Sequence, residues 1–278
     1  MLYCLFLSNM VKCSQLVHKR RSPYGAVEAG THQDPAALAD RNDRHRRSPS
    51  FDHRQKSLNI RMIPFQILAC VIIALEIGKQ ALSLHEGYDL YHLPFHFCSL
   101  FIFMLPIMAF YQGKHRQAVG AITSALCASM FLLMLIYPNL IYSGAAINGF
   151  FEDYFDFHTV AFHNVVMLEF LLIIALKLHT PAQKGEPVKA ILFTVGFCGV
   201  SASMAYILKT NFANYYSCNI PPLEALRLSL QGVLGVVLTQ ILYVLIISVL
   251  NILFVLLSYW LYRLIRRLTC GKETVAAQ

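Results

Sequence analysis

The sequence predicts an all-α protein, a polytopic transmembrane bundle of about six helices with both termini in the cytoplasm. Three observations predict this fold. The 278 residues are 56% hydrophobic and only 14% charged, whereas soluble domains carry about 25% charged residues. Several apolar runs approach the ~20 residues that a helix needs to cross a bilayer. Basic residues flank these runs, as they do in membrane proteins with positively charged cytoplasmic loops.

The apolar runs set the domain organisation. Residues 1–57 form a polar, basic tail without sustained periodicity, which we expect to be disordered. Residues 58–267 form the transmembrane bundle, and residues 268–278 a cytoplasmic tail. The expected spans are residues 62–83, 93–112, 117–137, 157–178, 188–209 and 233–262.

The last apolar stretch, from Pro222 to Tyr262, is long for one crossing and short for two crossings with a loop. Glu224, Arg227 and Gln231 recur in it at helical spacing. This pattern favours a short interfacial helix followed by one long span.

The charges between the spans predict the orientation. With the N-terminus inside, basic residues fall on the cytoplasmic side and acidic residues on the outer side. A seventh span would place the basic C-terminus outside, so six spans fit best. The inner loops hold Lys114, Arg116, Lys177, Lys184 and Lys189, and the outer loops hold Glu86, Asp89, Glu152, Asp153 and Asp156.

The charge distribution also predicts the partners and the location. Of the 23 Lys and Arg residues, 11 lie in residues 1–61 and four close the chain. Basic flanks around apolar spans indicate contact with membrane lipids rather than with nucleic acid. We therefore expect a multi-pass protein of the cell membrane. The eight Cys residues are scattered without CxxC spacing, which favours free thiols over disulfides.

Four of the expected spans carry polar residues at their outer ends. Ionisable groups at membrane depth are costly and are candidates for functional residues. We expect them to line a polar pocket that opens outward, although an interfacial ring of headgroup-binding residues is the alternative. The candidates are Glu76, Lys79, His96, Cys98, Ser99, His158, His163, Asn164, Lys209 and Asn211.

Several functions could use such a pocket. Cys98 could act as a nucleophile with His163 or His158 as the base, which would allow acyl transfer from a lipid. The histidines could instead bind a metal ion, although Pro94 disturbs the spacing of His92 and His96 and no metal or cofactor motif is present. The remaining interpretations are a membrane transport protein and a structural subunit without catalytic activity. We expect no cofactor.

Three motifs carry a resemblance to a known family. They are LPFHFCSL at 93–100, FHTVAFHN at 157–164, and LKTNFANY at 208–215 with the Pro-Pro-Leu-Glu turn at 221–224. Together the motifs resemble the YwaF-type integral membrane protein family, to which eukaryotic transmembrane protein 164 is distantly similar. That resemblance implies a polytopic helical fold, whose function in bacteria is mostly unassigned. The eukaryotic relative is regarded as a phospholipid acyltransferase, and similarity to it implies Cys98 as nucleophile and His158 and His163 as candidate bases.

Overall fold

The computed structural model describes residues 49–142, 150–181 and 185–270. Its chain divides into two units, Met1–Arg61 and Met62–Gln278. In the first unit, the described residues form the beginning of helix α2 (Pro49–Glu86). The tail expected to be disordered therefore lies outside the described residues up to position 48, and its last residues are helical.

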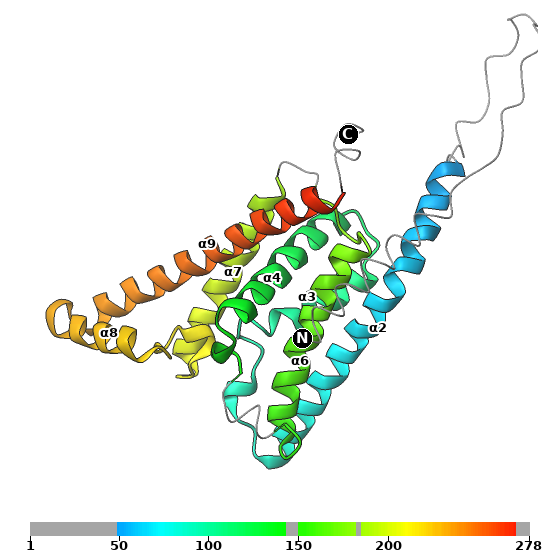
Figure 1. Ribbon diagram of the computed structural model, residues 1–278. Coiled ribbons are helices and arrows are strands. Elements are labelled where there is room, and N and C mark those ends of the chain that lie inside the picture. Colours follow the sequence, from blue (N-terminus) through cyan, green and yellow to red (C-terminus); the bar gives the residue numbers. More distant parts are fainter. Residues whose placement is uncertain (1–48, 143–149, 182–184, 271–278) are drawn as a thin grey trace, which may run out of the picture. The chain divides into compact units, whose positions relative to one another are not determined.

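The second unit is built of helices, and no strand occurs in the described part of the chain. After α2 come α3 (Leu100–Phe110), α4 (Arg116–Ile136), α6 (Tyr154–Ala175), α7 (Glu186–Ile207), α8 (Pro221–Leu234) and α9 (Val236–Cys270) (Figure 1). Within the described residues, five helices are long and apolar enough to cross a membrane: α2, α4, α6, α7 and α9. The all-α membrane bundle predicted from the sequence is confirmed.

The second expected span differs most from the prediction. Only Leu100–Phe110 is α-helical within residues 93–112. At 1.5 Å per residue, 11 residues reach about 16 Å, roughly half of the apolar thickness of a bilayer. Pro94 accounts for the extended conformation of Leu93 (φ −63°, ψ 147°), because proline restricts the preceding residue; residues 95–99 then form turns before α3 begins.

The last apolar stretch forms two helices, with the break at Gly235. Gly235 has φ +77°, a left-handed conformation that glycine adopts without a steric penalty. It ends α8 and leads into the 35-residue α9. Figure 1 shows α8 beside the first turns of α9.

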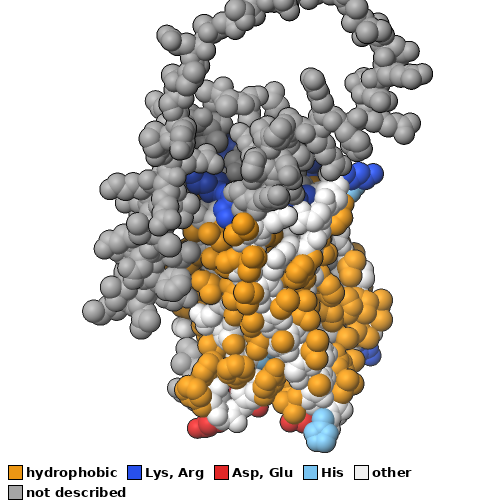
Figure 2. All heavy atoms as spheres, turned by 90° about the vertical axis from the view of Figure 1, so that its right-hand side faces the viewer, with side chains coloured by type: hydrophobic (Ala, Val, Ile, Leu, Met, Phe, Trp, Pro, Cys, Tyr) orange, Lys and Arg blue, Asp and Glu red, His pale blue; other side chains and the backbone are white. Residues whose placement is uncertain are grey.

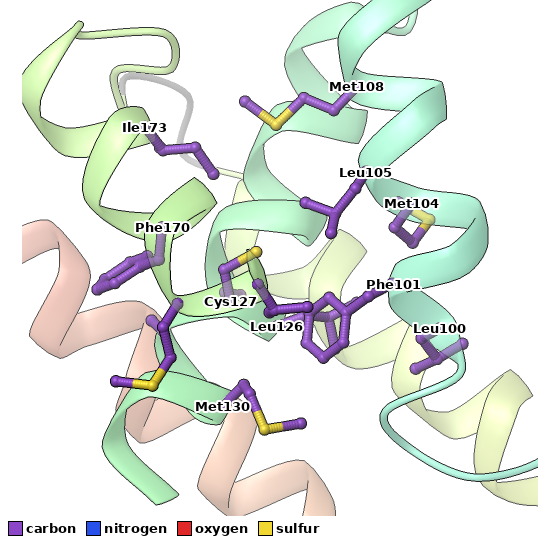
Figure 3. Close-up of a cluster of buried hydrophobic side chains, with 14 of the residues drawn as sticks. Leu100, Phe101, Met104, Leu105, Met108, Leu126, Cys127, Met130, Phe170 and Ile173 are labelled. Atoms are coloured by element: carbon purple, nitrogen blue, oxygen red, sulfur yellow. The ribbon is translucent and has the colours of Figure 1, made fainter. Parts of the chain in front are cut away.

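Helix α4 is the centre of the bundle, because it contacts α3, α6, α7 and α9. Many of its buried residues are small, among them Ala121, Ser124, Ala125 and Ala128. Small residues let neighbouring backbones approach closely, which drives helix association in membranes. Figure 3 shows the core where α3, α4 and α6 meet, with Phe101, Leu105, Leu126, Cys127 and Phe170 among the buried side chains.

The surface supports a membrane environment. On the face drawn in Figure 2, apolar side chains form a broad belt, with most of the Lys and Arg side chains near one end and the Asp and Glu side chains near the other. This charge separation is typical of a protein oriented across a bilayer. Which end faces the cytoplasm stays a prediction from the sequence.

Candidate functional site

A cavity of about 340 Å³ lies among the helix ends that the sequence predicts to face outward. Its size falls within the range of small-molecule sites, about 300–1,000 Å³. One group of lining residues is polar or ionisable: Glu76, Lys79, His92, His96, Cys98, Ser99, His158, Thr159, His163, Asn211, Asn214 and Asn219. The other group is apolar: Phe97, Ile102, Met130, Leu133, Ile141, Phe155, Phe162 and Ala213. The cavity is therefore amphipathic.

One wall comes from the segment between α2 and α3, which carries His92, His96 and Cys98. It begins with a short 3-10 helix, η1 (Leu90–His92), which Asp89 caps by accepting a hydrogen bond from the amide of Tyr91 at 2.9 Å. His92 and His96 do not form a helical pair, because η1 ends before Pro94 and α3 begins only at Leu100.

This segment is fixed to helices on two sides. The hydroxyl of Ser83 lies 2.7 Å from Nδ1 of His92, and the amide of Gln80 donates to the carbonyl oxygen of His92 at 2.9 Å. On the other side, the hydroxyl of Ser201 in α7 donates to the carbonyl oxygen of Phe95 at 2.7 Å. Partial burial lowers the pKa of His92 below its ordinary value. The hydrogen bonds of His92 and Phe95 position the Cys98 backbone, which follows Phe95 by three residues.

Cys98 lies directly before Ser99, the N-cap residue of α3. The positive end of the helix dipole favours a thiolate at this position, whereas burial of the thiol disfavours it. The Cys98 side chain is partly buried and lines the cavity. In the described residues, Cys98 and the histidines line one cavity, and no hydrogen bond joins the Cys98 thiol to an imidazole.

Helix α6 supplies His158 and His163. Nδ1 of His163 lies 2.6 Å from the carbonyl oxygen of Thr159, one turn earlier in the helix. A carbonyl only accepts, so Nδ1 must carry the ring proton in this contact. In the neutral ring, Nε2 of His163 then holds a lone pair, which is the form that a general base requires.

His158 is next to a carboxylate from α2. Oε2 of Glu76 lies 3.3 Å from Nε2 of His158. The other carboxylate oxygen of Glu76 contacts Nζ of Lys79 at 2.8 Å and accepts from the amide of Gln80 at 2.7 Å. Glu76 and His158 are 8% and 7% exposed, so both ends of this contact are protected from bulk water.

The remaining predicted residues divide into two groups. His96, Ser99 and Asn211 line the cavity. Asn164 is not among the lining residues, and its amide donates to the carbonyl oxygen of Val160 at 2.8 Å. Lys209 is exposed and also lies outside the lining.

In the described part of the chain, no three His, Cys, Asp or Glu side chains are grouped so that they could hold a metal ion.

A second polar cluster, which the sequence did not suggest, lies where α4, α7 and α9 meet the segment after α6. Glu186 is fully buried and accepts hydrogen bonds from the amide of Gln117 at 3.0 Å and from the hydroxyl of Tyr259 at 2.9 Å. Nε2 of His179 lies 3.7 Å from Glu186, and the carbonyl oxygen of His179 accepts from Tyr262 at 2.8 Å. The sequence did contain one indication of this cluster, because Tyr259 and Tyr262 are three residues apart and therefore lie on one face of α9.

Comparison with known proteins gives one finding about relationship. The model of the TMEM164 family matches residues 36–262, which include all candidate site residues. The match agrees with the similarity to transmembrane protein 164 predicted from the sequence, while the YwaF-type label stays a resemblance. No curated protein and no solved structure matches the chain.

Proposed function

The chain belongs to the TMEM164 family, and from this premise we propose that it is a multi-pass membrane enzyme that transfers lipid acyl chains through Cys98. The observation that carries the proposal is the shared cavity. Cys98 and His163 come from different segments of the chain, yet both line one cavity that also has an apolar wall. A nucleophile, a base and an apolar surface are the parts that acyl transfer from a lipid requires.

The chemistry follows from the groups present. Nε2 of His163 takes the proton from the Cys98 thiol, and the thiolate attacks the ester carbonyl carbon of an acyl lipid. The bond between that carbon and the ester oxygen breaks, the leaving alcohol receives the proton from His163, and the acyl chain remains on Cys98 as a thioester. An alcohol then attacks the thioester, the C–S bond breaks, and Cys98 regains a proton.

The apolar wall suits the acyl chain. Ile102, Met130 and Leu133 come from α3 and α4 and present alkyl side chains to the same space as Cys98. Burying an apolar chain against such residues is favourable by about 25 cal/mol per Å² of surface removed from water. Other polar lining residues, His96 and Asn211, suit the ester and the headgroup.

The proposal is tested by acyl transfer with purified protein in lipid nanodiscs that contain a phospholipid with a labelled acyl chain. Cys98→Ser should reduce transfer at least about 100-fold, because a hydroxyl is a far weaker nucleophile than a thiolate. Cys70→Ser is the matched control, because Cys70 is an exposed thiol on α2 outside the cavity, and it should retain wild-type transfer. Full transfer by Cys98→Ser would refute the proposal.

A further inference from the structure

Three side chains that line the cavity each have a buried polar atom without a hydrogen-bond partner among the described residues. These atoms are Oε2 of Glu76, Nε2 of His158 and Oδ1 of Asn214. Oε2 and Nε2 lie 3.3 Å apart, so a proton on Nε2 joins them as an ion pair, whereas a neutral His158 with its proton on Nδ1 leaves both atoms without a donor. A buried polar atom without a partner costs about 1–3 kcal/mol, so these acceptors around a neutral His158 indicate that a ligand supplies a missing donor.

The unpartnered atoms define what that ligand offers. A carboxylate oxygen and an amide oxygen only accept hydrogen bonds, so the ligand must donate. Nε2 of His158 can accept a proton when the ring is neutral with hydrogen on Nδ1. The polar wall therefore suits a ligand group that donates a hydrogen bond.

The charges favour a neutral donor over a cation. Glu76 is already paired with the ammonium of Lys79 at 2.8 Å and accepts from Gln80. A cationic group placed on the other oxygen of Glu76 would lie close to Lys79, where like charges repel strongly in a protected site. A hydroxyl group brings the donor without that repulsion.

We infer that Glu76, His158 and Asn214 form a subsite for the hydroxyl group of the acyl acceptor, separate from the Cys98–His163 pair that forms the thioester. This inference rests on the proposed acyl transfer. The single proton of the hydroxyl is held between Oε2 of Glu76 and Oδ1 of Asn214 on binding and then passes to Nε2 of His158, and Oε2 of Glu76, 3.3 Å away, stabilises the imidazolium that forms. The hydroxyl oxygen then attacks the thioester carbonyl carbon, the C–O bond forms, and the C–S bond breaks. His158 returns the proton to the departing Cys98 thiolate.

Two half-reactions can be measured separately to test this division. The protein is loaded from a labelled phospholipid in the absence of acceptor, and a monoacyl phospholipid with a free glycerol hydroxyl is then added. Glu76→Gln, His158→Asn and Asn214→Gly should load Cys98 within about 2-fold of the wild-type rate and transfer at least about 10-fold more slowly, since losing a general base costs about 10²–10⁴. Glycine suits position 214, where φ is +63°.

The matched controls are Glu86→Gln and His115→Asn, which change exposed side chains outside the cavity and should leave both half-reactions unchanged. Unfolding temperatures identify any variant that fails to fold. If the three subsite variants slow loading as much as transfer, the separate subsite is refuted while Cys98 chemistry stands.

A binding measurement keeps the inference testable without thioester formation. In Cys98→Ala protein, the monoacyl phospholipid should bind at least about 10-fold more tightly than its deoxy analogue, which lacks the hydroxyl, because buried acceptors penalise a ligand without the donor. Glu76→Gln should remove that preference. Equal binding of the two lipids would refute the subsite. Absence of a thioester in wild-type protein, with the binding preference intact, would instead refute the proposed function.

Discussion

Nδ1 of His163 donates its proton to the carbonyl oxygen of Thr159 at 2.6 Å, within the same helix. The contact sets the tautomer and the orientation of the ring by means of the backbone, whereas in the catalytic triad of serine proteases a carboxylate sets them. The consequence is that the two histidines of α6 differ. His163 is oriented by its own helix, whereas His158 lies next to Glu76 of α2.

Replacing His163 should abolish acylation of Cys98. His163→Gln keeps a polar side chain but supplies no base, so the rate of thioester formation should fall by about 10²–10⁴. The rate should rise with pH in this variant, because hydroxide then replaces the missing base. The measurement is single-turnover loading of Cys98 from a labelled phospholipid, with His115→Gln as the exposed control. An unchanged loading rate would show that His163 is not the base.

Gly120 should tolerate no side chain. A Cβ added there would lie 2.7 Å from Cδ2 of His179, closer than van der Waals contact permits. Gly120→Ala should therefore cost about 1–3 kcal/mol of unfolding free energy. Gly199→Ala on α7 is the control, because no atom lies within 4 Å of its added Cβ, and its stability should be unchanged or higher. Reversible unfolding in mixed detergent micelles measures both. Equal stability of the two variants would contradict the close packing of His179 on α4.

The buried cluster around Glu186 should stabilise the bundle. Tyr259→Phe removes the hydroxyl that donates to Glu186 at 2.9 Å, and losing one donor to a buried carboxyl should cost about 1–3 kcal/mol. Tyr137→Phe changes an exposed tyrosine and should be neutral within about 0.5 kcal/mol. The same unfolding assay separates them. A neutral Tyr259→Phe would mean that this hydrogen bond does not stabilise the fold.

The beginning of α8 should weaken in acid, because Glu224 and Arg227 lie in its first turns. The Arg227 guanidinium donates to Glu224 at 2.8 Å and holds the pKa of that carboxyl below its ordinary value. A carboxyl whose pKa is lowered by folding contributes stability above its unfolded pKa of about 4, and this contribution is lost as pH falls through the folded pKa. The loss should be below about 1 kcal/mol, because the pair is partly solvated.

Unfolding temperatures between pH 7 and pH 3 measure this contribution. Glu224→Gln should show a weaker acid dependence than the wild type, whereas Glu152→Gln, an exposed control, should follow the wild type. Identical acid profiles for all three proteins would show that the Glu224–Arg227 pair does not stabilise the folded state.

Much of the fold follows from hydropathy, because a helix in lipid must satisfy its own backbone and its length is set by the bilayer. The division of the last stretch also had a local signal in Glu224 and Arg227, which the structure joins on one face of α8. The start of α3 was harder to predict. Residues 93–99 are apolar enough to belong to a membrane-spanning helix. Only Pro94 interrupts the pattern, and the α-helix begins later, at Leu100.

The site was predictable in part for a similar reason. The positions of Glu76, Cys98 and His163 along the expected spans predicted that the three residues lie at the same depth in the membrane. The structure places all three on one cavity. Gln80 and Ser83 were missed, because each looks like an isolated polar residue within α2 until the chain returns to place His92 against them. The Glu186 cluster was missed because its hydrogen-bonded pairs lie up to 83 residues apart in sequence, and single-sequence patterns do not report such contacts.

The most direct test of the central claim is the mass of the peptide that contains Cys98 after wild-type protein has been incubated with a diacyl phospholipid and quenched in acid. This peptide should gain the mass of one acyl chain. Hydroxylamine should remove that added mass, and His163→Gln should prevent the addition. An unmodified Cys98 in protein that still transfers acyl chains, or an acyl thioester on another cysteine, would contradict the central claim.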